Sequence, residues 1–438
     1  MAAGDTPNYA YVTLITRSSY LAGVVVLAHT LRAHGSSYPL VVLYTASLPA
    51  SSVRALEAEA PRTNLVLQPC EPLLPRSDTP VHLIAERFAD TWTKLRVFSL
   101  LRYDTLCYLD ADMAVFNGSM DAIFAVAEAA LPRGRADGED RIAANHACVC
   151  NLDGDAWAPP DWTPANCAYT PLRHPRALAQ PTPAGGPVPA HHLLNSGMFV
   201  FRPRAALWAR MLRFFDTTDR LGGYKFPDQD FLADFFRGRW VSVGWQFNAL
   251  KTMRYWHPAM WRDDAVVCLH YIVDKPWARR VGDDGVAGYL GRDGETHRWW
   301  WACFAEWERQ REGLEVLELV RRCVARPPGE EGDEDADMKA IGSQVQAFAK
   351  NKPNGKESES NGAANGVANG AARENGAAKE NGAVKENGAA RENGDREQSD
   401  RQVNGEAPAQ GPHGPILRKK MLGERGHGPV VHDTPNGS

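Results

Sequence analysis

The stretch "YAYVTLITRSSYLAGVVVLAHTLRAHGSSYPLVVLYT", residues 9–45, predicts a strand, a helix and a second strand in immediate succession. Residues 9–16 are rich in aromatic and β-branched side chains, which favour a strand. Residues 20–35 form an apolar run with helical character that ends at Gly35, and glycine is common just after a helix. Residues 39–45 are nearly all apolar and predict a buried strand.

A second helix at residues 49–60 and a third strand at residues 64–69 continue this alternation. Strand, helix, strand, helix and strand in short order predict a parallel sheet covered by helices, of the type that binds nucleotides. The predicted fold class is therefore α/β. In such sheets ligands bind at the carboxyl ends of the strands, so the residues that follow each strand are the candidates for a functional site.

The 438 residues divide into two parts at about Pro327. Of the whole chain 44% is hydrophobic, which is ample for a large core, and all 13 tryptophans precede this point. Residues 354–394 then repeat Asn-Gly-Ala units, which oppose helix and offer too few apolar groups to offset the entropy lost on ordering. We predict one α/β domain at residues 1–326 and a disordered low-complexity tail, an unstructured spacer, at residues 327–438.

Composition also limits the partners and the location of the protein. A formal net charge of −4 gives no electrostatic reason to expect nucleic acid as a partner. Residues 1–20 lack a basic stretch followed by an apolar one, and no run approaches the roughly 20 apolar residues that span a bilayer. We therefore expect a cytoplasmic protein that does not interact with a membrane. In that compartment the eight cysteines are expected to stay reduced.

Two carboxylates, Asp110 and Asp112, lie inside the apolar run "TLCYLDADMAVFNG", residues 105–118, after a predicted helix at residues 91–104. Buried without a partner, such groups are costly, so the chain must pair them, protonate them or bind a cation there. In an extended segment both side chains point to the same side and can face one ion. Oxygen ligands select Mg²⁺ or Mn²⁺, which keep open positions for substrate phosphates. The alternative is a solvated turn.

Three later motifs carry polar groups into apolar surroundings. Residues 191–203, "HHLLNSGMFVFRP", set Asn-Ser-Gly in the middle of a predicted strand. Residues 225–236, "KFPDQDFLADFF", predict a helix with acidic side chains in its first turn. Residues 265–277, "AVVCLHYIVDKPW", predict a buried strand that ends on a histidine and is followed by Lys-Pro-Trp.

Taken in order, these motifs resemble those of the family 8 glycosyltransferases, the group that contains glycogenin and galactinol synthase. The resemblance rests on Asp-x-Asp, Asn-Ser-Gly-Met-Phe-Val-Phe, Asp-Gln-Asp-Phe-Leu and His-Tyr followed by Lys-Pro-Trp, and it runs from about Tyr11 to Trp277. It implies a GT-A type single domain with a Rossmann-like mixed sheet flanked by helices. It also implies a UDP-sugar donor and bound Mn²⁺, with Mg²⁺ as the alternative ion.

The resemblance implies a metal site and a diphosphate contact. Asp110, Asp112 and His270 would hold the metal, and Lys275 would face the diphosphate as a point charge. The alternatives are a histidine satisfied within the core and a lysine exposed before a turn.

The segment "TLITRSSY" resembles the uridine-binding segment of the family, with Leu14 and Thr16 near the base and Tyr20 stacking on uracil. Lys94, in "TWTKL", would approach the nucleotide sugar. Without the resemblance, Tyr20 is equally well a core aromatic, and Lys94 a solvated charge on a helix.

Four further residues match the family's sugar site. Asn195 and Ser196 match the segment that lines the sugar and acceptor cleft, and Asp228 and Gln229 match the carboxylate and glutamine beside the sugar. We take Asn195, Asp228 and Gln229 as catalytic candidates and Ser196 as a donor-binding one. An Asn amide among buried aliphatic side chains needs hydrogen-bond partners, which sugar hydroxyls or the backbone would supply. Asp228 has the alternative role of a helix N-terminal charge.

The chain departs from the glycogenin pattern in places. Glycogenin has a glycine between the metal histidine and Lys-Pro-Trp, whereas "HYIVDKPW" has Val273 and one residue fewer, and "PDQD" lacks paired glycines. "ACVCNLDGDAW" and "NALKTMRYWHP", the latter at residues 248–258, resemble galactinol synthase instead. The spacing of Cys148, Cys150 and Cys167 is poor for a zinc site, so we interpret them as reduced structural thiols.

We therefore expect a metal-dependent, retaining hexosyltransferase of the galactinol synthase type, which moves galactose or glucose from UDP to an acceptor hydroxyl. The acceptor is a polyol, a saccharide or a protein tyrosine, and the sequence does not choose between the two sugars. One alternative is a glycogenin-like protein that glucosylates itself, for which Tyr169, Tyr224 and Tyr289 lie in predicted loops. Another is a non-catalytic nucleotide-sugar-binding scaffold, against which the intact metal motif argues.

Residues 297–323 predict a long amphipathic helix with Trp300, Phe304, Trp307 and Leu314 on roughly one face. We expect this face to pack on the core. A homodimer surface and a platform for the acceptor are the alternatives.

Overall fold

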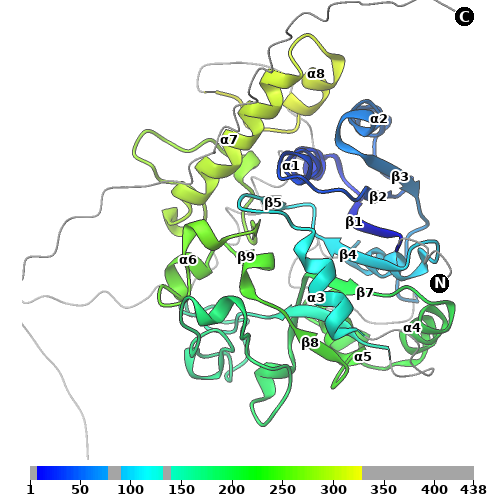
Figure 1. The fold of residues 1–438 in the computed structure, drawn as a ribbon, viewed down its shortest axis with the longest axis vertical. Coiled ribbons are helices and arrows are strands. Elements are labelled where there is room, and N and C mark those ends of the chain that lie inside the picture. The colour runs from blue at the N-terminus through cyan, green and yellow to red at the C-terminus, as the bar shows by residue number, and fades with distance from the viewer. Residues whose placement is uncertain (1–6, 77–89, 132–139, 328–438) are drawn as a thin grey trace, which may run out of the picture. The chain divides into compact units, whose positions relative to one another are not determined.

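A computed structural model describes residues 7–76, 90–131 and 140–327, and Figure 1 labels their elements. The main layer is a seven-stranded sheet with the order β3-β2-β1-β4-β7-β6-β8. Its strands are β1 (Tyr9–Ile15), β2 (Leu40–Tyr44), β3 (Leu65–Pro69), β4 (Thr105–Leu109), β6 (Ile142–His146), β7 (Leu194–Phe201) and β8 (Trp240–Ser242). Strands β3, β2, β1 and β4 run parallel, whereas β7 is antiparallel to both β4 and β6. The predicted α/β class with a mixed sheet is confirmed.

Two hydrophobic cores form on opposite faces of this sheet, because alternate residues of a strand point to opposite faces. Tyr11 of β1 and Cys107 of β4 belong to one core, and Val12 and Leu106 belong to the other. The first core contains side chains of α1 (Leu21–Ala33), α2 (Ala50–Thr63), α3 (Ala122–Ala130), α7 (Gly294–Gln310) and α8 (Glu315–Arg321). The second contains side chains of α4 (Ala205–Thr217), α5 (Pro227–Phe235) and the 3-10 segment Thr91–Ser99. Helices therefore flank both faces.

A smaller sheet beyond the carboxyl end of β4 brings distant segments together. It has the order β5-β10-β9 and consists of β5 (Met113–Val115), β10 (Cys268–His270) and β9 (Ala249–Leu250). Strand β10 is antiparallel to β5, with His270 opposite Met113, and the N–H of Tyr271 donates to the carbonyl of Asp112 at 2.9 Å. This register holds His270 beside the turn that joins β4 to β5.

The segment that leads to this turn differs from the prediction. Instead of a helix at residues 91–104, the chain forms the 3-10 segment Thr91–Ser99, which is followed by a turn. Asp110 and Asp112 do not lie in an extended segment either, because the chain turns between β4 and β5. The same-side placement expected for an extended chain is therefore replaced by a turn that carries both carboxylates.

The predicted helix at residues 297–323 is two helices, α7 and α8. The chain turns between them at Gly313, whose φ of +77° is left-handed and favours glycine. On α7, Trp300, Phe304 and Trp307 are buried in the first core, so the expected core packing of that face is confirmed.

The predicted tail, residues 327–438, lies outside the described residues apart from Pro327. Both sheets and all the labelled helices lie before that residue. The division of the chain near Pro327 stays a prediction.

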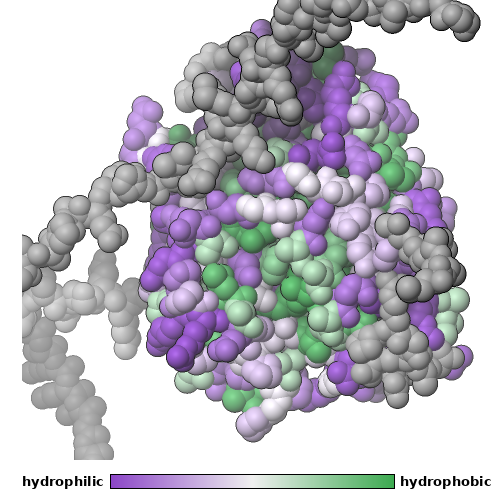
Figure 2. Space-filling view, in the orientation of Figure 1, coloured by the Kyte–Doolittle hydropathy of each residue, from purple (hydrophilic) through white to green (hydrophobic). Residues whose placement is uncertain are grey.

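The described surface carries scattered apolar residues. Figure 2 shows hydrophobic residues near the middle of one face, where Figure 1 places α3, whose sequence is AIFAVAEAA and whose Val126 is 37% exposed. Single exposed apolar side chains are normal on protein surfaces. Within the described ranges, no helix combines the length and the apolar character that crossing a bilayer requires.

A buried ion pair joins α2 to the end of α7. Glu59 of α2 is fully buried, and Arg311, directly after α7, is 4% exposed. The guanidinium donates from Nε to one carboxylate oxygen at 2.7 Å and from Nη2 to the other at 2.9 Å. Two such parallel bonds fix direction as well as distance, so the pair fastens α7 to α2 in one orientation.

Replacing Glu59 by glutamine is expected to lower the free energy of unfolding by about 3–5 kcal/mol, because Arg311 would stay buried without its counter-charge. Urea unfolding followed by circular dichroism measures this loss. The matched control is Glu308→Gln, which removes one of the two carboxylate partners of the half-exposed Arg321 and should cost at most about 1 kcal/mol. Equal losses in the two variants would contradict the structural role of the buried pair.

Candidate functional site

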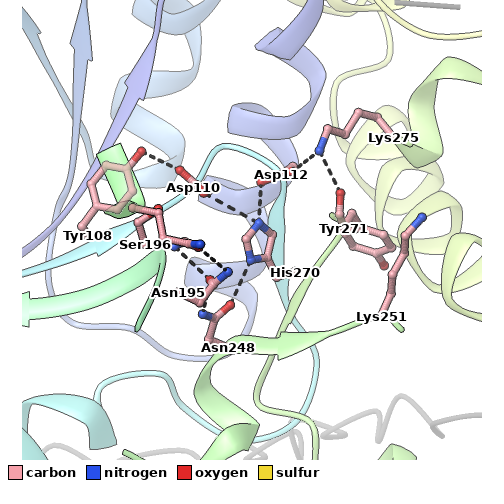
Figure 3. Close-up of polar contacts among 12 residues, drawn as sticks. Tyr108, Asp110, Asp112, Asn195, Ser196, Asn248, Lys251, His270, Tyr271 and Lys275 are labelled. Carbon is pink, nitrogen blue, oxygen red and sulfur yellow. Dashed lines mark hydrogen bonds and ion pairs between the residues drawn. The ribbon is translucent and has the colours of Figure 1, made fainter. Parts of the chain in front are cut away.

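Asp110 divides its two carboxylate oxygens between different partners, as Figure 3 shows. Its Oδ1 accepts a hydrogen bond of 2.7 Å from the hydroxyl of Tyr108 and lies 2.9 Å from Nζ of Lys94. Its Oδ2 lies 3.7 Å from Nε2 of His270. One oxygen therefore holds the carboxylate in place, and the other is directed at the imidazole.

Asp112 shows the same division. Its Oδ1 lies 3.3 Å from Nε2 of His270, and its Oδ2 pairs with the ammonium of Lys275, which also donates to the carbonyl of Tyr271 at 2.9 Å. Burial alone would raise the pKa of this carboxyl group, but Lys275 and His270 outweigh burial and hold the pKa of Asp112 well below its usual value. Asp112 is therefore ionised at neutral pH.

Hydrogen bonds determine which nitrogen of His270 faces the carboxylates. The N–H of Gly197 donates to Oδ1 of Asn195 at 3.0 Å, and Nδ2 of Asn248 donates to the same oxygen at 2.8 Å. Oδ1 of Asn248 then faces Nδ1 of His270 at 3.0 Å, so Nδ1 must carry the hydrogen. Nε2 is therefore the nitrogen that faces the carboxylates, and it is the atom that a metal ion held there would meet. Asn195 also donates to Oε1 of Gln229 at 3.2 Å, which ties the predicted sugar residues to this chain of bonds.

Asp110, Asp112 and His270 each offer one ligand atom, and these three atoms lie within 4.8 Å of one another. Nε2 of His270 faces Oδ2 of Asp110 and Oδ1 of Asp112. Ligands at right angles around an ion with bonds of about 2.1 Å are about 3 Å apart. The separations of 3.3 and 3.7 Å from Nε2 need only a small adjustment to match. Two carboxylate oxygens and one imidazole suit a divalent ion such as Mn²⁺ or Mg²⁺. The three residues fit the predicted metal site.

Lys94 joins the carboxylate turn to the segments predicted to bind sugar. Its ammonium lies 2.9 Å from Asp110 and 2.5 Å from Oδ2 of Asp228. The hydroxyl of Ser196 donates to the same oxygen of Asp228 at 2.8 Å. Burial would lower the pKa of Lys94, but the two carboxylates raise it above its usual value, so the ammonium stays charged. Because Lys94 is only 6% exposed, the alternative of a solvated helix charge is wrong.

The twelve residues predicted for the site all line one cavity of about 410 Å³. They are Leu14, Thr16, Tyr20, Lys94, Asp110, Asp112, Asn195, Ser196, Asp228, Gln229, His270 and Lys275. The cavity lies at the carboxyl ends of β1 and β4, where an α/β sheet is expected to bind its ligand, and its volume suits a small molecule. The fold therefore brings the predicted residues together, and their separate roles stay predictions.

The Lys-Pro-Trp motif packs against the segment predicted to bind uridine. The ring of Trp277 meets the half-buried ring of Tyr20 edge-on at 5.9 Å, and its Nε1 donates to the carbonyl of Ser19 at 2.8 Å. Nζ of Lys275 lies 5.8 Å from the centre of the Tyr20 ring. Residues more than 250 positions apart thus form one wall of the cavity.

Sequence reasoning missed an aromatic wall and one hydrogen-bonding residue. Trp157, Trp162 and Phe226 line the cavity, with the ring of Trp157 5.6 Å from Trp162 and 5.4 Å from Phe226. Nζ of Lys225 donates to the carbonyl of Trp157 at 2.7 Å and ties this wall to the start of α5. Two tryptophans in a polar loop were a usable signal, because such side chains seldom stay exposed without a function.

The other missed residue is Asn248, which orients His270. It lies in residues 248–258, a stretch that was singled out only because it resembles galactinol synthase.

Comparison with known proteins places this chain beside plant enzymes. It is 28% identical to galactinol synthase 1 of Solanum lycopersicum over 271 residues, which cover 61% of this chain and 73% of that protein. It is 28% identical to galactinol synthase 6 of Arabidopsis thaliana over 278 residues, covering 62% and 74%. A galactosyltransferase structure, LgtC with donor and acceptor sugar analogues, matches with a TM-score of 0.43 and 15% identity over 68% of this chain and 95% of that one. No protein-family model matches the chain.

Gly197→Ala is expected to lower the affinity for Mn²⁺ at least about tenfold, because a Cβ at this position of β7 would overlap the imidazole of His270 and displace it. Titration calorimetry with Mn²⁺ measures the affinity. The matched control is Gly223→Ala, where an added Cβ meets open space and the affinity should not change. Unchanged affinity in both variants would contradict the assignment of His270 as a metal ligand.

Val273 has a φ of +69°, a left-handed conformation that is strained for a β-branched residue. Glycine, which the glycogenin pattern has in this segment, adopts it without a steric penalty. Val273→Gly is expected to raise the free energy of unfolding by up to about 1 kcal/mol, as relief of strain exceeds the added entropy of the unfolded chain.

Thermal unfolding measures the effect at Val273. The control is Val286→Gly, at an exposed valine outside the left-handed region, which should lose stability because only the entropy of the unfolded chain changes. A loss of stability at both positions would contradict the inferred strain.

Proposed function

We propose that this chain is a family 8-like, nucleotide-sugar-dependent glycosyltransferase and, more closely, a metal-dependent, retaining hexosyltransferase. Its similarity to the galactinol synthases supports the first part of this proposal. The donor is UDP-galactose or UDP-glucose, and the acceptor is a hydroxyl group. The observation that carries this proposal is the convergence of one oxygen each of Asp110 and Asp112 with Nε2 of His270 at the cavity. The galactinol synthase relatives make galactose and a polyol acceptor the first pair to test.

The charges around the cavity support departure of a diphosphate. A divalent ion held by Asp110, Asp112 and His270 would neutralise the charge that develops on the leaving group. Lys275 lines the same cavity and is paired with Asp112, so its ammonium can turn from that carboxylate to a phosphate oxygen over a short distance. Fixed positive charge aimed at a leaving group commonly lowers the barrier of such a reaction more than any other single effect.

In the transfer itself, the bond from the sugar anomeric carbon to the diphosphate oxygen breaks, and its electron pair leaves with UDP. The acceptor oxygen then bonds to the same face of that carbon, which retains the configuration, and the departing phosphate oxygen takes the acceptor proton. This route needs no strong protein base. Asp228 is already bound by Lys94 and Ser196, and Gln229 by Asn195, so these contacts support a role in positioning the sugar.

The alternative of self-glucosylation receives less support from the tyrosines considered for it. Tyr169 is 3% exposed and donates its hydroxyl to the carbonyl of His146 at 2.8 Å. Tyr224 is also buried and donates to Asp234 at 2.6 Å. Tyr289 lines the cavity but is itself 9% exposed. An acceptor that must enter the cavity from outside therefore fits better than any of these side chains.

Asp112→Asn is expected to lower the rate of sugar transfer at least about a hundredfold, because a metal ligand and the counter-charge of Lys275 are both lost. The assay measures UDP release with Mn²⁺ across a panel of UDP-sugars, with myo-inositol or maltooligosaccharide added, and identifies the product by mass spectrometry. Asp161→Asn, at an exposed carboxylate, is the control and should keep full activity.

Three outcomes of this assay are distinguishable. Release of UDP from one donor, accelerated by one acceptor, would support the transferase and name both substrates. Hexose increments on the intact protein would move the assignment to self-glucosylation. Binding of UDP without turnover of any donor, or full activity in Asp112→Asn, would overturn the proposed metal-dependent transfer.

A further inference from the structure

Four side chains outside the carboxylate site converge on one point. Sγ of Cys148, Cys150 and Cys167 lie 3.3, 3.4 and 3.7 Å from Nε2 of His257. Sγ of Cys148 lies 3.9 Å from Sγ of Cys167, and all four ligand atoms are within 4.8 Å of one another. We propose that these four residues bind a structural Zn²⁺ ion, independently of the transfer reaction proposed above.

The spacing of the four atoms is that of a tetrahedral zinc site. With Zn–S bonds of about 2.3 Å and a Zn–N bond of about 2.1 Å, the ligand atoms lie about 3.8 Å (S to S) and 3.6 Å (S to N) apart. The separation of 3.9 Å between Sγ of Cys148 and Sγ of Cys167 and those of 3.3 to 3.7 Å between sulfur and nitrogen match these values. The other two sulfur pairs are within 4.8 Å. Three thiols and one imidazole form a frequent ligand set of structural zinc.

Two other uses of these residues explain the arrangement less well. A disulfide needs a sulfur separation of about 2.05 Å, and Cys148 and Cys167 are almost twice as far apart. Packing of reduced thiols gives no reason for a histidine from a distant segment to direct its Nε2 at three sulfurs. Cys150, Cys167 and His257 are 2%, 1% and 5% exposed, whereas Cys148 is half-buried and lines the cavity. Three of the four ligands would therefore shield a bound ion from water, as in structural sites.

The chemistry of this set also separates it from the carboxylate site. Soft thiolate ligands select Zn²⁺, whereas the oxygen-rich set of Asp110 and Asp112 suits Mn²⁺ or Mg²⁺. The chain would therefore hold two different metals in two sites. The spacing of the cysteines in the sequence did not predict a zinc site, because Cys148 and Cys150 are only two residues apart. The other two ligands, Cys167 and His257, lie further along the chain.

The position of the site shows what the ion would stabilise. Cys150 and Cys167 bracket residues 151–166, whose only regular element is the 3-10 segment Pro164–Asn166. This segment includes Trp157 and Trp162 of the aromatic wall. His257 directly follows α6 (Met253–Trp256), whose Trp256 also lines the cavity.

A long irregular segment buries little apolar surface of its own and needs another constraint to hold one conformation. A zinc ion bound at both ends of residues 151–166 and to the end of α6 supplies that constraint. The site is thus a staple for one wall of the cavity, and its ligands are structural, not catalytic.

The test is the metal content of the full-length protein, purified without added chelator and dialysed against metal-free buffer. Inductively coupled plasma mass spectrometry should find close to one zinc per chain, and replacement by Co²⁺ should give the intense thiolate absorption bands of a tetrahedral site. Less than a fifth of an equivalent of zinc after reconstitution, or a Cys148–Cys167 disulfide in the alkylated protein, would overturn the proposal.

Variants locate the ion. Cys167→Ser and His257→Gln should lose zinc, whereas His257→Cys, which restores a soft ligand, should retain it. Cys303→Ser removes a thiol elsewhere in the chain, and Asp112→Asn alters the carboxylate site, so both should retain one zinc. Zinc retained in the Cys167 and His257 variants would place the ion elsewhere. If those variants fail to fold, the metal content and cobalt spectrum of the wild-type protein still decide the question.

Hydrogen exchange tests the structural consequence without relying on catalysis. Removal of zinc by a chelator should increase the rate of amide hydrogen exchange at least about tenfold in peptides from residues 151–166. The rate should change little in α1, whose side chains are buried in the first core. A uniform increase throughout the chain, or none in residues 151–166, would overturn the assignment of the ion as a staple for this wall.

Discussion

The two carboxylates that follow β4 are tolerated in a buried turn because each is divided between a lysine and His270. Asp110 faces Lys94 with one oxygen and the imidazole with the other, and Asp112 does the same with Lys275. Removing a partner from such an arrangement would leave an uncompensated charge, which is among the costliest defects in a protein interior. The lysines come from the segment before β4 and from the loop after β10. Neutralising the two carboxylates therefore requires both sheets, because Lys94 precedes β4 of the large sheet and Lys275 follows β10 of the small one.

Close backbone contact is what keeps this turn in place. On one side, the N–H of Asp110 donates to the carbonyl of Gly197 in β7 at 2.8 Å, and Gly197 leaves room for the ring of His270. On the other side, Gly23 of α1 lies against the carbonyl of Ala111 and the ring of Trp277, where any Cβ would collide. Glycine is needed at both positions because a backbone must approach another group closely, not because of its φ. Helix α1 and strand β7 thus both contact the turn closely through a glycine.

The parts of this arrangement that follow from local pattern could be predicted from the sequence. The alternation in residues 9–69 determines β1, α1, β2, α2 and β3, and the apolar run around Asp110 marks the end of a strand. The motifs for the cavity could be recognised because each lies within a few residues of a strand or helix end. Asn248 and His257 could not, since their importance depends on which distant segments the small sheet and α6 bring next to them. The break at Gly313 was missed because an amphipathic pattern continues across it.

Three convergent groups of ligating side chains occur in the described part of the chain, and their surroundings distinguish them. In the group of Asp274, Asp293 and His297, the fully buried ammonium of Lys251 lies 2.7 Å from Asp274 and 2.8 Å from Asp293. That lysine already supplies the central charge, so the group forms an ion-pair network that needs no metal. At the carboxylate turn, Lys94 and Lys275 each contact one oxygen of a carboxylate, and the other oxygen of each carboxylate faces His270. At the thiol group the neighbours are the other thiols, Thr170 and His257. The location of the nearest ammonium thus separates the ion-pair network from the two groups that we propose to bind metal ions.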